Sequence, residues 1–346
     1  MAAFEAPPLP ALVASLVPAA QSEVADLPVA QRMRAAYWLK HVYERDATAR
    51  GDARRALEAG MRHRAHGSLL RHECAYVLGQ LRDAAAQASL EAVLGDEEED
   101  AMLRHECAEA LGAIGVGEAA LARLAGSPDA PWEVAQTCEI AVDFLRWRRG
   151  GAEGPVIACA CMLSPFNSHD PAPPDPDHAS WTAEALGSRL SDAGAPIFER
   201  YRAMFSLRNR GGERCVAALG RALVGDGSSP LLRHEVAFVL GQLQHPAALP
   251  FLAESLRRAG EHAIVRHEAA EAIGALEGCW DACEAILTEF SKDADAVIAQ
   301  SCEVALDAAD YFGRTGRDDD DDGVSFANLK EGQVGLHFNL ATQLTV

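Results

Sequence analysis

Apolar residues along the chain recur with the spacing that is typical of one face of an α-helix. Between Leu69 and Leu81 they fall at Leu70, Cys74 and Val77, with Leu81 as the last member. These positions are i, i+4, i+7 and i+11, which form one narrow apolar stripe at about 100° per residue. The same spacing returns along the chain, without the alternation of a half-buried strand. The pattern therefore predicts an all-α protein.

The triplet Arg-His-Glu stands inside this predicted helix and occurs four times. Its histidines are His72, His105, His234 and His267. The first two are 33 residues apart, as are the last two, and 162 residues separate corresponding members of the two pairs. The chain is therefore a duplication of a duplication. A helical period of this length is typical of an α-solenoid, in which helix pairs stack on one another.

The repeats fall into two similar arms of about four units each. In the outer units, Gln136 begins QTCEIAVD and Gln300 begins QSCEVALD, while Gln31 begins QRMRAAYWLK and Glu199 begins ERYRAMFSLR. Between the arms, the prolines of SPFNSHDPAPPDPDH forbid a continuous helix. We therefore predict an N-terminal arm over 1–149, a Pro-rich linker over 150–196, a C-terminal arm over 197–314 and an acidic, mostly disordered tail over 315–346.

Helix geometry turns each histidine away from the apolar stripe of its own helix. His72 lies roughly 160 to 200° round the helix from the stripe, so we expect it outside the core of its repeat, with Glu73 one step round. Glycine follows each histidine by seven residues, at Gly79, Gly112, Gly241 and Gly274. Glycine inside a helix costs about 1 kcal/mol relative to alanine. We therefore predict that either a ligand approaches the backbone there or neighbouring helices pack closely.

Four imidazoles and four carboxylates at equivalent places favour a metal site over a surface hydrogen-bond consensus. Two histidines and one carboxylate with open positions are the ligand set of non-haem iron that activates dioxygen. Each arm offers one such set with a spare glutamate, which predicts one metal per arm and a dinuclear site between the arms. The spacing leaves iron or manganese, and oxygenase or hydrolase, open. The candidate ligands are His72, Glu73, His105, Glu106, His234, Glu235, His267 and Glu268.

The composition indicates which kinds of binding partner and which cellular compartment to expect. With 51 acidic and 31 basic residues the formal net charge is −20, which argues against nucleic acid and anionic membranes and favours a basic protein or polyamine-like group. The alternative interpretation is that the negative charge only keeps the protein soluble. The nine cysteines show no zinc-finger spacing, and neither a signal peptide nor a long apolar run is present. We therefore expect a monomeric protein of the reducing cytoplasm.

The four Arg-His-Glu helices resemble those of the deoxyhypusine hydroxylase family. FERYRAMFSLRN, LLRHEVAFVLGQLQHP and SHDPAPP are also similar to segments of that family, and the resemblance runs over roughly Val29–Ala309. It implies a HEAT-repeat protein whose two iron ions use dioxygen to hydroxylate the deoxyhypusine side chain of translation initiation factor five-A, completing hypusine formation. The family's metal pairs fall on the four His-Glu pairs. Departures are the acidic insert Asp96–Asp100, a longer unit around Ala47–Arg55 and the tail after Arg314.

The implied substrate suggests a role for the remaining carboxylates. Deoxyhypusine is a polyamine-like chain with cationic nitrogens, which carboxylates beyond those bound to metal would receive. We predict that the second His-Glu pair of each arm gives both residues to metal. Glu73 and Glu235 then lie closer to the substrate amine or hydrogen-bond the ligands. Glu109 and Glu271, one turn past the second histidine of each arm, are further candidates for the amine, with a salt bridge to a neighbouring arginine as the alternative.

Two other functions fit the same residues. A non-catalytic HEAT-repeat scaffold would hold no iron and show no oxygen-dependent colour. A dinuclear metallohydrolase on the same ligands would work without dioxygen and would retain activity with zinc.

Overall fold

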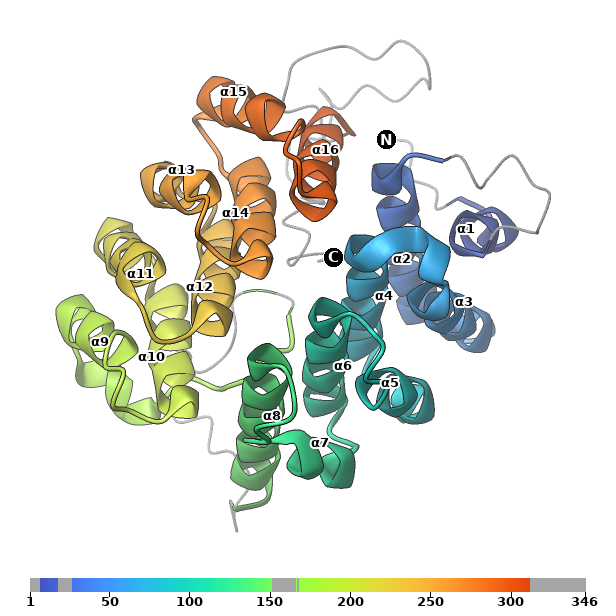
Figure 1. The fold of residues 1–346 in the computed structure, drawn as a ribbon, viewed down its shortest axis with the longest axis horizontal. Coiled ribbons are helices and arrows are strands. Elements are labelled where there is room, and N and C mark those ends of the chain that lie inside the picture. Colours follow the sequence, from blue (N-terminus) through green and yellow to red (C-terminus); the bar gives the residue numbers. More distant parts are fainter. Residues whose placement is uncertain (1–6, 18–26, 151–165, 167, 312–346) are drawn as a thin grey trace. The chain divides into compact units, whose positions relative to one another are not determined.

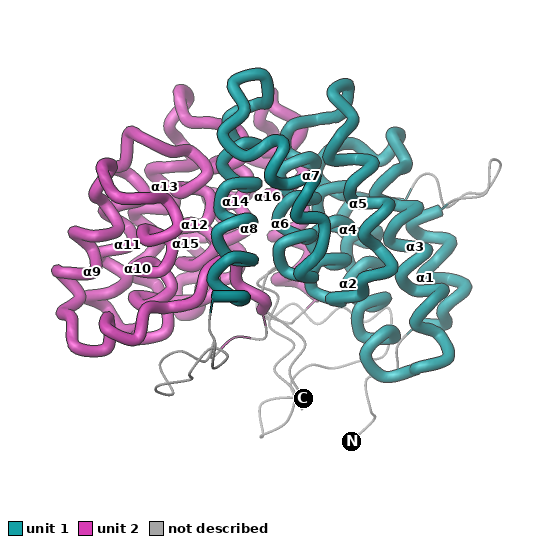
Figure 2. Tube along the Cα trace, turned by 90° about the horizontal axis from the view of Figure 1, so that it is seen from below, with its two compact units in different colours: residues 1–155 teal, residues 156–346 magenta. Residues whose placement is uncertain are grey.

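The computed structural model describes residues 7–17, 27–150, 166 and 168–311. In these ranges every regular element is a helix and there is no strand, which confirms the predicted all-α class. The chain forms two compact units, residues 1–155 and residues 156–346 (Figure 2). Within the described ranges, no helix is both long and apolar enough to cross a membrane.

Unit 1 is a stack of helix pairs in two layers (Figure 1). The even-numbered helices form one layer, in which α2 packs against α4, α4 against α6 and α6 against α8. The odd-numbered helices form the other layer, and each packs against an even-numbered neighbour. The helices are α1 (Leu9–Leu16), α2 (Val29–Arg45), α3 (Arg50–Arg62), α4 (Gly67–Leu81), α5 (Gln87–Leu94), α6 (Ala101–Ile114), α7 (Glu118–Leu124) and α8 (Trp132–Gly150).

Unit 2 repeats this plan. Its even-numbered layer runs from α10 to α12 to α14 to α16, and its odd-numbered helices cover that layer on one side. The helices are α9 (Ala183–Leu190), α10 (Ile197–Arg210), α11 (Glu213–Gly225), α12 (Pro230–Leu243), α13 (Leu249–Arg257), α14 (Ala263–Ala275), α15 (Trp280–Phe290) and α16 (Ala296–Tyr311).

The predicted linker over 150–196 is in part folded. Residues 151–165 and 167 lie outside the described residues, as does the predicted tail over 315–346. From Ser168 onward the chain is fixed to unit 2, because Gln242 Nε2 donates to Ser168 Oγ at 3.1 Å and Asp170 pairs with Arg208 at 2.5 Å. Further on, α9 packs against α10 and α11. The C-terminal arm of the structure therefore begins before residue 197. A helix can form at α9 because no proline interrupts its apolar spacing.

Three of the four glycines that follow the histidines, Gly79, Gly112 and Gly274, allow neighbouring helices of the even-numbered layer to touch. A Cβ atom on Gly79 would lie 2.8 Å from the Cα atom of Ala110 in the next helix, and one on Gly274 would lie 2.6 Å from the Cβ atom of Ala305. Both separations are closer than real side chains tolerate. Of the two predicted reasons for these glycines, the structure shows close helix packing.

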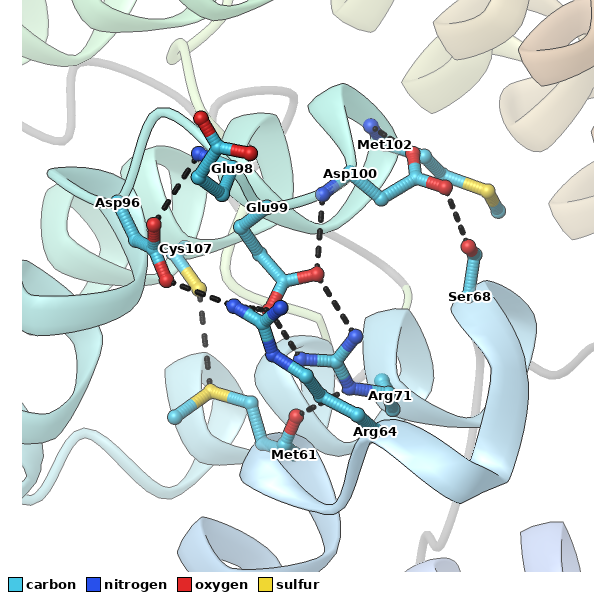
Figure 3. Close-up of polar contacts among 10 residues, drawn as sticks. All are labelled: Met61, Arg64, Ser68, Arg71, Asp96, Glu98, Glu99, Asp100, Met102 and Cys107. Carbon is cyan, nitrogen blue, oxygen red and sulfur yellow. Dashed lines mark hydrogen bonds and ion pairs between the residues drawn. The ribbon is translucent and has the colours of Figure 1, made fainter.

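The arginine of each triplet forms hydrogen bonds and ion pairs that stabilise its repeat, and it does not take part in the cluster of histidines and glutamates. Arg71 Nε donates to the Met61 carbonyl at 2.8 Å, and its guanidinium meets both oxygens of Glu99 at 2.7 and 2.5 Å (Figure 3). Arg233 similarly donates to both carboxylate oxygens of Glu261, from Nε at 2.8 Å and from Nη2 at 2.6 Å. A paired and hydrogen-bonded guanidinium is the form in which this charge tolerates burial. Each clamp therefore ties its helix to the start of the next repeat.

The acidic insert Asp96–Asp100 supplies this clamp in unit 1 (Figure 3). Glu99 belongs to it, and Asp96 pairs with Arg64 at 2.9 Å. Asp100 accepts the backbone N–H of Met102 at 2.9 Å and so caps the first turn of α6. The insert is therefore a structural turn that positions the start of α6.

Candidate metal centre

The His-Glu pairs of unit 1 lie on two adjacent helices. His72 and Glu73 belong to α4, while His105 and Glu106 belong to α6, and these helices pack side by side (Figure 1). The imidazole rings of His72 and His105 have their centroids 5.4 Å apart. His72 Nε2 lies 3.1 Å from Glu106 Oε2. The structure thus brings together the four residues that the sequence predicted for this arm.

Unit 2 shows the same arrangement on α12 and α14. The rings of His234 and His267 are again 5.4 Å apart. His234 Nε2 lies 3.5 Å from Glu268 Oε2. In both units, then, the first histidine faces the second glutamate across the helix pair, which is what internal duplication of one repeat predicts.

All four histidines and their four adjacent glutamates are buried, and this corrects one expectation. The sequence placed His72 outside the core of its repeat because it faces away from the apolar stripe. The stripe residues Leu70, Cys74 and Val77 are indeed buried as well. Angle around a helix gives the direction of a side chain but not what covers it. Here the polar face of α4 meets the polar face of α6, so both faces of α4 are enclosed.

Glu73 contacts groups on two sides. Its Oε2 atom accepts a hydrogen bond from the Tyr37 hydroxyl of α2 at 2.6 Å, and its Oε1 atom lies 3.3 Å from His72 Nδ1. Burial by itself lowers the pKa of His72, but Glu106 and Glu73 outweigh it and hold that pKa well above its ordinary value. The two carboxylates therefore favour a cation at this place. Sequence reasoning missed Tyr37 because it lies on another helix.

Glu271 approaches the second histidine of unit 2 from one turn away. Its Oε1 atom lies 3.6 Å from His267 Nδ1 and accepts a hydrogen bond from Ser301 Oγ of α16 at 3.2 Å. Ser301 is a second residue that sequence reasoning missed. It occupies the place in QSCEVALD that a glutamate holds in the His-Glu helices, so the alignment of repeats contained the signal. Glu109, the counterpart of Glu271, is partly exposed.

The donor atoms fit a metal ion of the kind that the sequence predicted. His234, His267 and Glu268 each place one ligand atom within 4.8 Å of the others, and so do His105, Glu106 and Glu109. Bonds of about 2.0 to 2.2 Å to nitrogen and oxygen place ligand atoms about 3 to 4.4 Å apart, so small side-chain rotations bring either group into range. Imidazole with carboxylate suits iron, manganese or zinc.

Two pairs of cysteines lie close in the sequence and could be read as metal ligands, Cys159 with Cys161 and Cys279 with Cys283. Cys159 and Cys161 lie outside the described residues. Cys279 and Cys283 have their sulfur atoms 3.6 Å apart, but no group of three candidate ligands in the described ranges includes them. The cysteines within the apolar helical patterns, including Cys74, are buried and behave as small apolar residues.

Fold and site together define a class: a helical-repeat protein with a buried imidazole and carboxylate set in each of its two units. Comparison with known families agrees with the repeat, since HEAT repeats match residues 183–274 and 216–307, and a PBS lyase HEAT-like repeat matches residues 70–96. The first match begins where α9 begins, which supports the corrected start of the C-terminal arm.

Comparison with individual proteins is more specific. The chain is 46% identical to deoxyhypusine hydroxylase of Homo sapiens over 250 residues, covering 72% of this chain and 78% of that protein. It is 41% identical to the Drosophila melanogaster deoxyhypusine hydroxylase over 284 residues, covering 82% and 87%. A solved structure of human deoxyhypusine hydroxylase in complex with glycerol superposes with a TM-score of 0.74, at 39% identity, over 88% of this chain and 96% of that one. The chain belongs to the deoxyhypusine hydroxylase family.

Proposed function

We propose that the protein hydroxylates the deoxyhypusine side chain of translation initiation factor five-A, with dioxygen as co-substrate and two iron ions per chain. The observation that carries the proposal is the duplicated set of two buried histidines and their glutamates, with the same geometry in each unit. Membership of the family supports the reaction type. Duplication of the set supports two ions rather than one.

One glutamate in each unit is the carboxylate ligand in this proposal. In unit 2 the set is His234, His267 and Glu268, whose ligand atoms already gather within 4.8 Å. In unit 1 the corresponding set is His72, His105 and Glu106, supported by the 3.1 Å approach of His72 Nε2 to Glu106 Oε2. Iron held by two imidazoles and one carboxylate retains open positions, at which it supplies the activation of dioxygen.

Glu73 then has an orienting role. Its Oε1 atom accepts the Nδ1–H of His72, which leaves the Nε2 lone pair directed toward the metal position. A carboxylate behind a histidine ligand fixes both the tautomer and the orientation of the ring. Glu235 holds the equivalent place in unit 2, so we assign it the same role or contact with the substrate amine.

Glu109 and Glu271 are the proposed receivers of the cationic substrate chain. They stand one helical turn beyond His105 and His267, close to the metal position but not needed in a set with one carboxylate. The net charge of −20 favours approach of a cationic side chain. Binding that cation near the metal position would hold the target carbon in place for reaction.

The reaction inserts one oxygen atom of dioxygen into a carbon–hydrogen bond and reduces the other atom to water, which requires two electrons from an added reductant. The test incubates protein loaded with Fe(II), or with Zn(II), with the deoxyhypusine form of the substrate protein under isotopically heavy dioxygen. We expect the iron protein alone to add one labelled oxygen atom to the side chain. A reaction that proceeds without dioxygen, or with zinc, would indicate a hydrolase. If the iron-loaded protein gives no reaction, the result would favour the alternative of a non-catalytic HEAT-repeat scaffold.

A further inference from the structure

Cys279 and Cys283 are two thiols in contact at the start of α15. Their Sγ atoms lie 3.6 Å apart, and the backbone N–H of Cys283 donates to the Cys279 carbonyl at 3.2 Å. A disulfide holds its sulfur atoms about 2.0 Å apart, so small side-chain rotations would bring the two atoms within bonding distance. Within the described ranges no third candidate ligand joins them, so the pair is placed for thiol oxidation rather than for metal binding.

The backbone around the pair combines a fixed point with local freedom. The Glu277 N–H donates to the Gln244 carbonyl at the end of α12 at 3.0 Å, which fixes the chain just before the pair. Gly278 follows with a φ of 72°, and a Cβ atom there would meet nothing within 4 Å. Cys279 is the N-cap of α15, with a φ of −142° and a ψ of 32° that lie outside the helical region. The Cys279 side chain can therefore move toward Cys283 while the rest of α15 stays in place.

Exposure distinguishes this pair from the other cysteines of the described ranges. Cys279 is partly exposed, whereas the other free cysteines there are buried. Burial raises the pKa of the Cys138 and Cys302 thiols to about 12, so very little of their reactive thiolate is present at neutral pH. Oxidants react with a thiolate that they can reach. Cys279 is therefore the thiol that an oxidant meets first, and Cys283 is the thiol that lies beside it.

We propose that Cys279 and Cys283 form a dithiol that hydrogen peroxide oxidises to a disulfide, which fixes the first turn of α15. The Cys279 thiolate attacks one peroxide oxygen, the O–O bond breaks, and the hydroxide that leaves takes up the thiol proton to give water. Cys279 is then a sulfenic acid. The Cys283 sulfur attacks the Cys279 sulfur, the S–O bond breaks, and a second water leaves with the Cys283 proton. The two thiols together lose two electrons, and one peroxide gains them.

The disulfide would act on the last repeat of unit 2. Here α15 packs against α14 and α16, and α14 carries His267 and Glu268. Helix ends ordinarily fray, and a covalent link between the N-cap and the first turn opposes that fraying. A dithiol reductant reverses the link by thiol–disulfide exchange. This chemistry needs no metal ion and does not depend on the proposed function.

The test exposes the reduced full-length protein, in the presence of a metal chelator, to hydrogen peroxide. The protein is then unfolded, and its remaining thiols are alkylated with iodoacetamide. Tryptic cleavage after Arg266 and Lys292 releases both cysteines in one peptide, 267–292. We expect this peptide to carry no alkyl group and to be lighter by two hydrogen atoms than its reduced form. Treatment with dithiothreitol before alkylation should restore two alkyl groups, and the peptide of Cys302 should be alkylated throughout.

Variants and amide exchange then test the order of the steps and their effect. Cys283→Ser should stop at a sulfenic acid on Cys279, which dimedone labels, and Cys279→Ser should leave the buried Cys283 reduced. Cys215→Ser is the matched control, because it removes a buried thiol elsewhere in unit 2, and it should form the disulfide as the wild type does. Backbone amides of residues 280–284 should exchange more slowly with deuterium in the oxidised wild type than in the reduced one.

Three outcomes would overturn the inference. The first is a 267–292 peptide that remains fully alkylated after peroxide treatment. The second is a disulfide that joins either cysteine to another part of the chain or to a second molecule. The third is unchanged amide exchange over residues 280–284 once the disulfide has formed. All three are read from the wild-type protein, so none of them depends on whether a variant folds.

Discussion

His72 Nε2 and Glu106 Oε2 lie 3.1 Å apart, although the two residues belong to different repeats. Neither helix alone carries a complete set of two histidines and one glutamate at this place. The set forms only when α4 and α6 pack side by side, and the same holds for His234 and Glu268 on α12 and α14. Whatever fixes the spacing of these helices therefore also fixes the site.

The close helix packing at Gly274 gives the first prediction. Gly274→Ala would place a Cβ atom 2.6 Å from that of Ala305, so α14 and α16 must move apart. Overpacking of this kind costs about 1 to 3 kcal/mol of unfolding free energy. Chemical denaturation measures it. Gly225→Ala is the matched control, because a Cβ atom at this helix end meets nothing within 4 Å. Equal stability of both variants would show that this packing is loose.

Glu99 gives the second prediction, through its clamp on Arg71. Glu99→Ala leaves the buried guanidinium with only the Met61 carbonyl, and breaking a buried pair costs about 3 kcal/mol. Urea unfolding should show this loss, whereas Glu97→Ala, in the same acidic insert but exposed, should change stability little. If both variants unfold like the wild type, the clamp does not hold α4 to the next repeat.

The pH dependence of stability is predicted from His66. Its Nδ1 atom accepts from Arg32 at 3.1 Å, which places the ring proton on Nε2, the donor to the Leu16 carbonyl at 2.6 Å. Burial lowers the pKa of this imidazole below its ordinary value of 6.5. A neutral histidine with a lowered pKa contributes stability above pH about 6.5. That contribution is lost as pH falls from there toward the lowered pKa.

Melting temperatures between pH 5 and pH 8 test this prediction. The wild type should lose stability below pH about 6.5, and His66→Gln should flatten that part of the curve, because glutamine does not titrate. His63→Gln is the comparison, since the His63 ring stacks on His66 and its charge contributes less than burial does to the lowered pKa of His66. It should flatten the curve less than His66→Gln does. An unchanged pH curve in His66→Gln would assign the loss to other groups.

Glu109 and Glu271 are predicted to serve substrate binding and not metal binding. Glu109→Gln or Glu271→Gln should raise KM about fivefold, equivalent to about 1 kcal/mol, while metal content stays the same. Glu97→Gln removes one exposed charge elsewhere and serves as the control. Association should also slow as salt shortens the Debye length. If KM is unchanged in both variants and the association rate does not depend on salt concentration, charge does not position the substrate.

The residues that we propose as metal ligands could be singled out from the sequence because they recur. Four Arg-His-Glu triplets, spaced at 33 and 162 residues, predict both the repeat and which residues meet. Helix periodicity likewise predicts the buried stripe around Cys74. Tyr37 was not predictable in this way, because it reaches Glu73 from a neighbouring helix and lies in no His-Glu triplet. Ser301 was overlooked, although alignment of QSCEVALD with the His-Glu helices places it where those helices have glutamate. Similarly, α9 was not predicted, because it is short and follows a run of prolines that is typical of a linker.

Iron content tests the central claim, that each unit holds its own metal set, most directly. Wild-type protein, His105→Ala, His267→Ala and the exposed control Glu97→Gln are loaded anaerobically with Fe(II), freed of excess metal and analysed for iron per chain. We predict two irons in the wild type and in the control, and one iron in each histidine variant, lost from the unit that carries the substitution. Retention of two irons by either histidine variant, or no iron in the wild type, would contradict the claim.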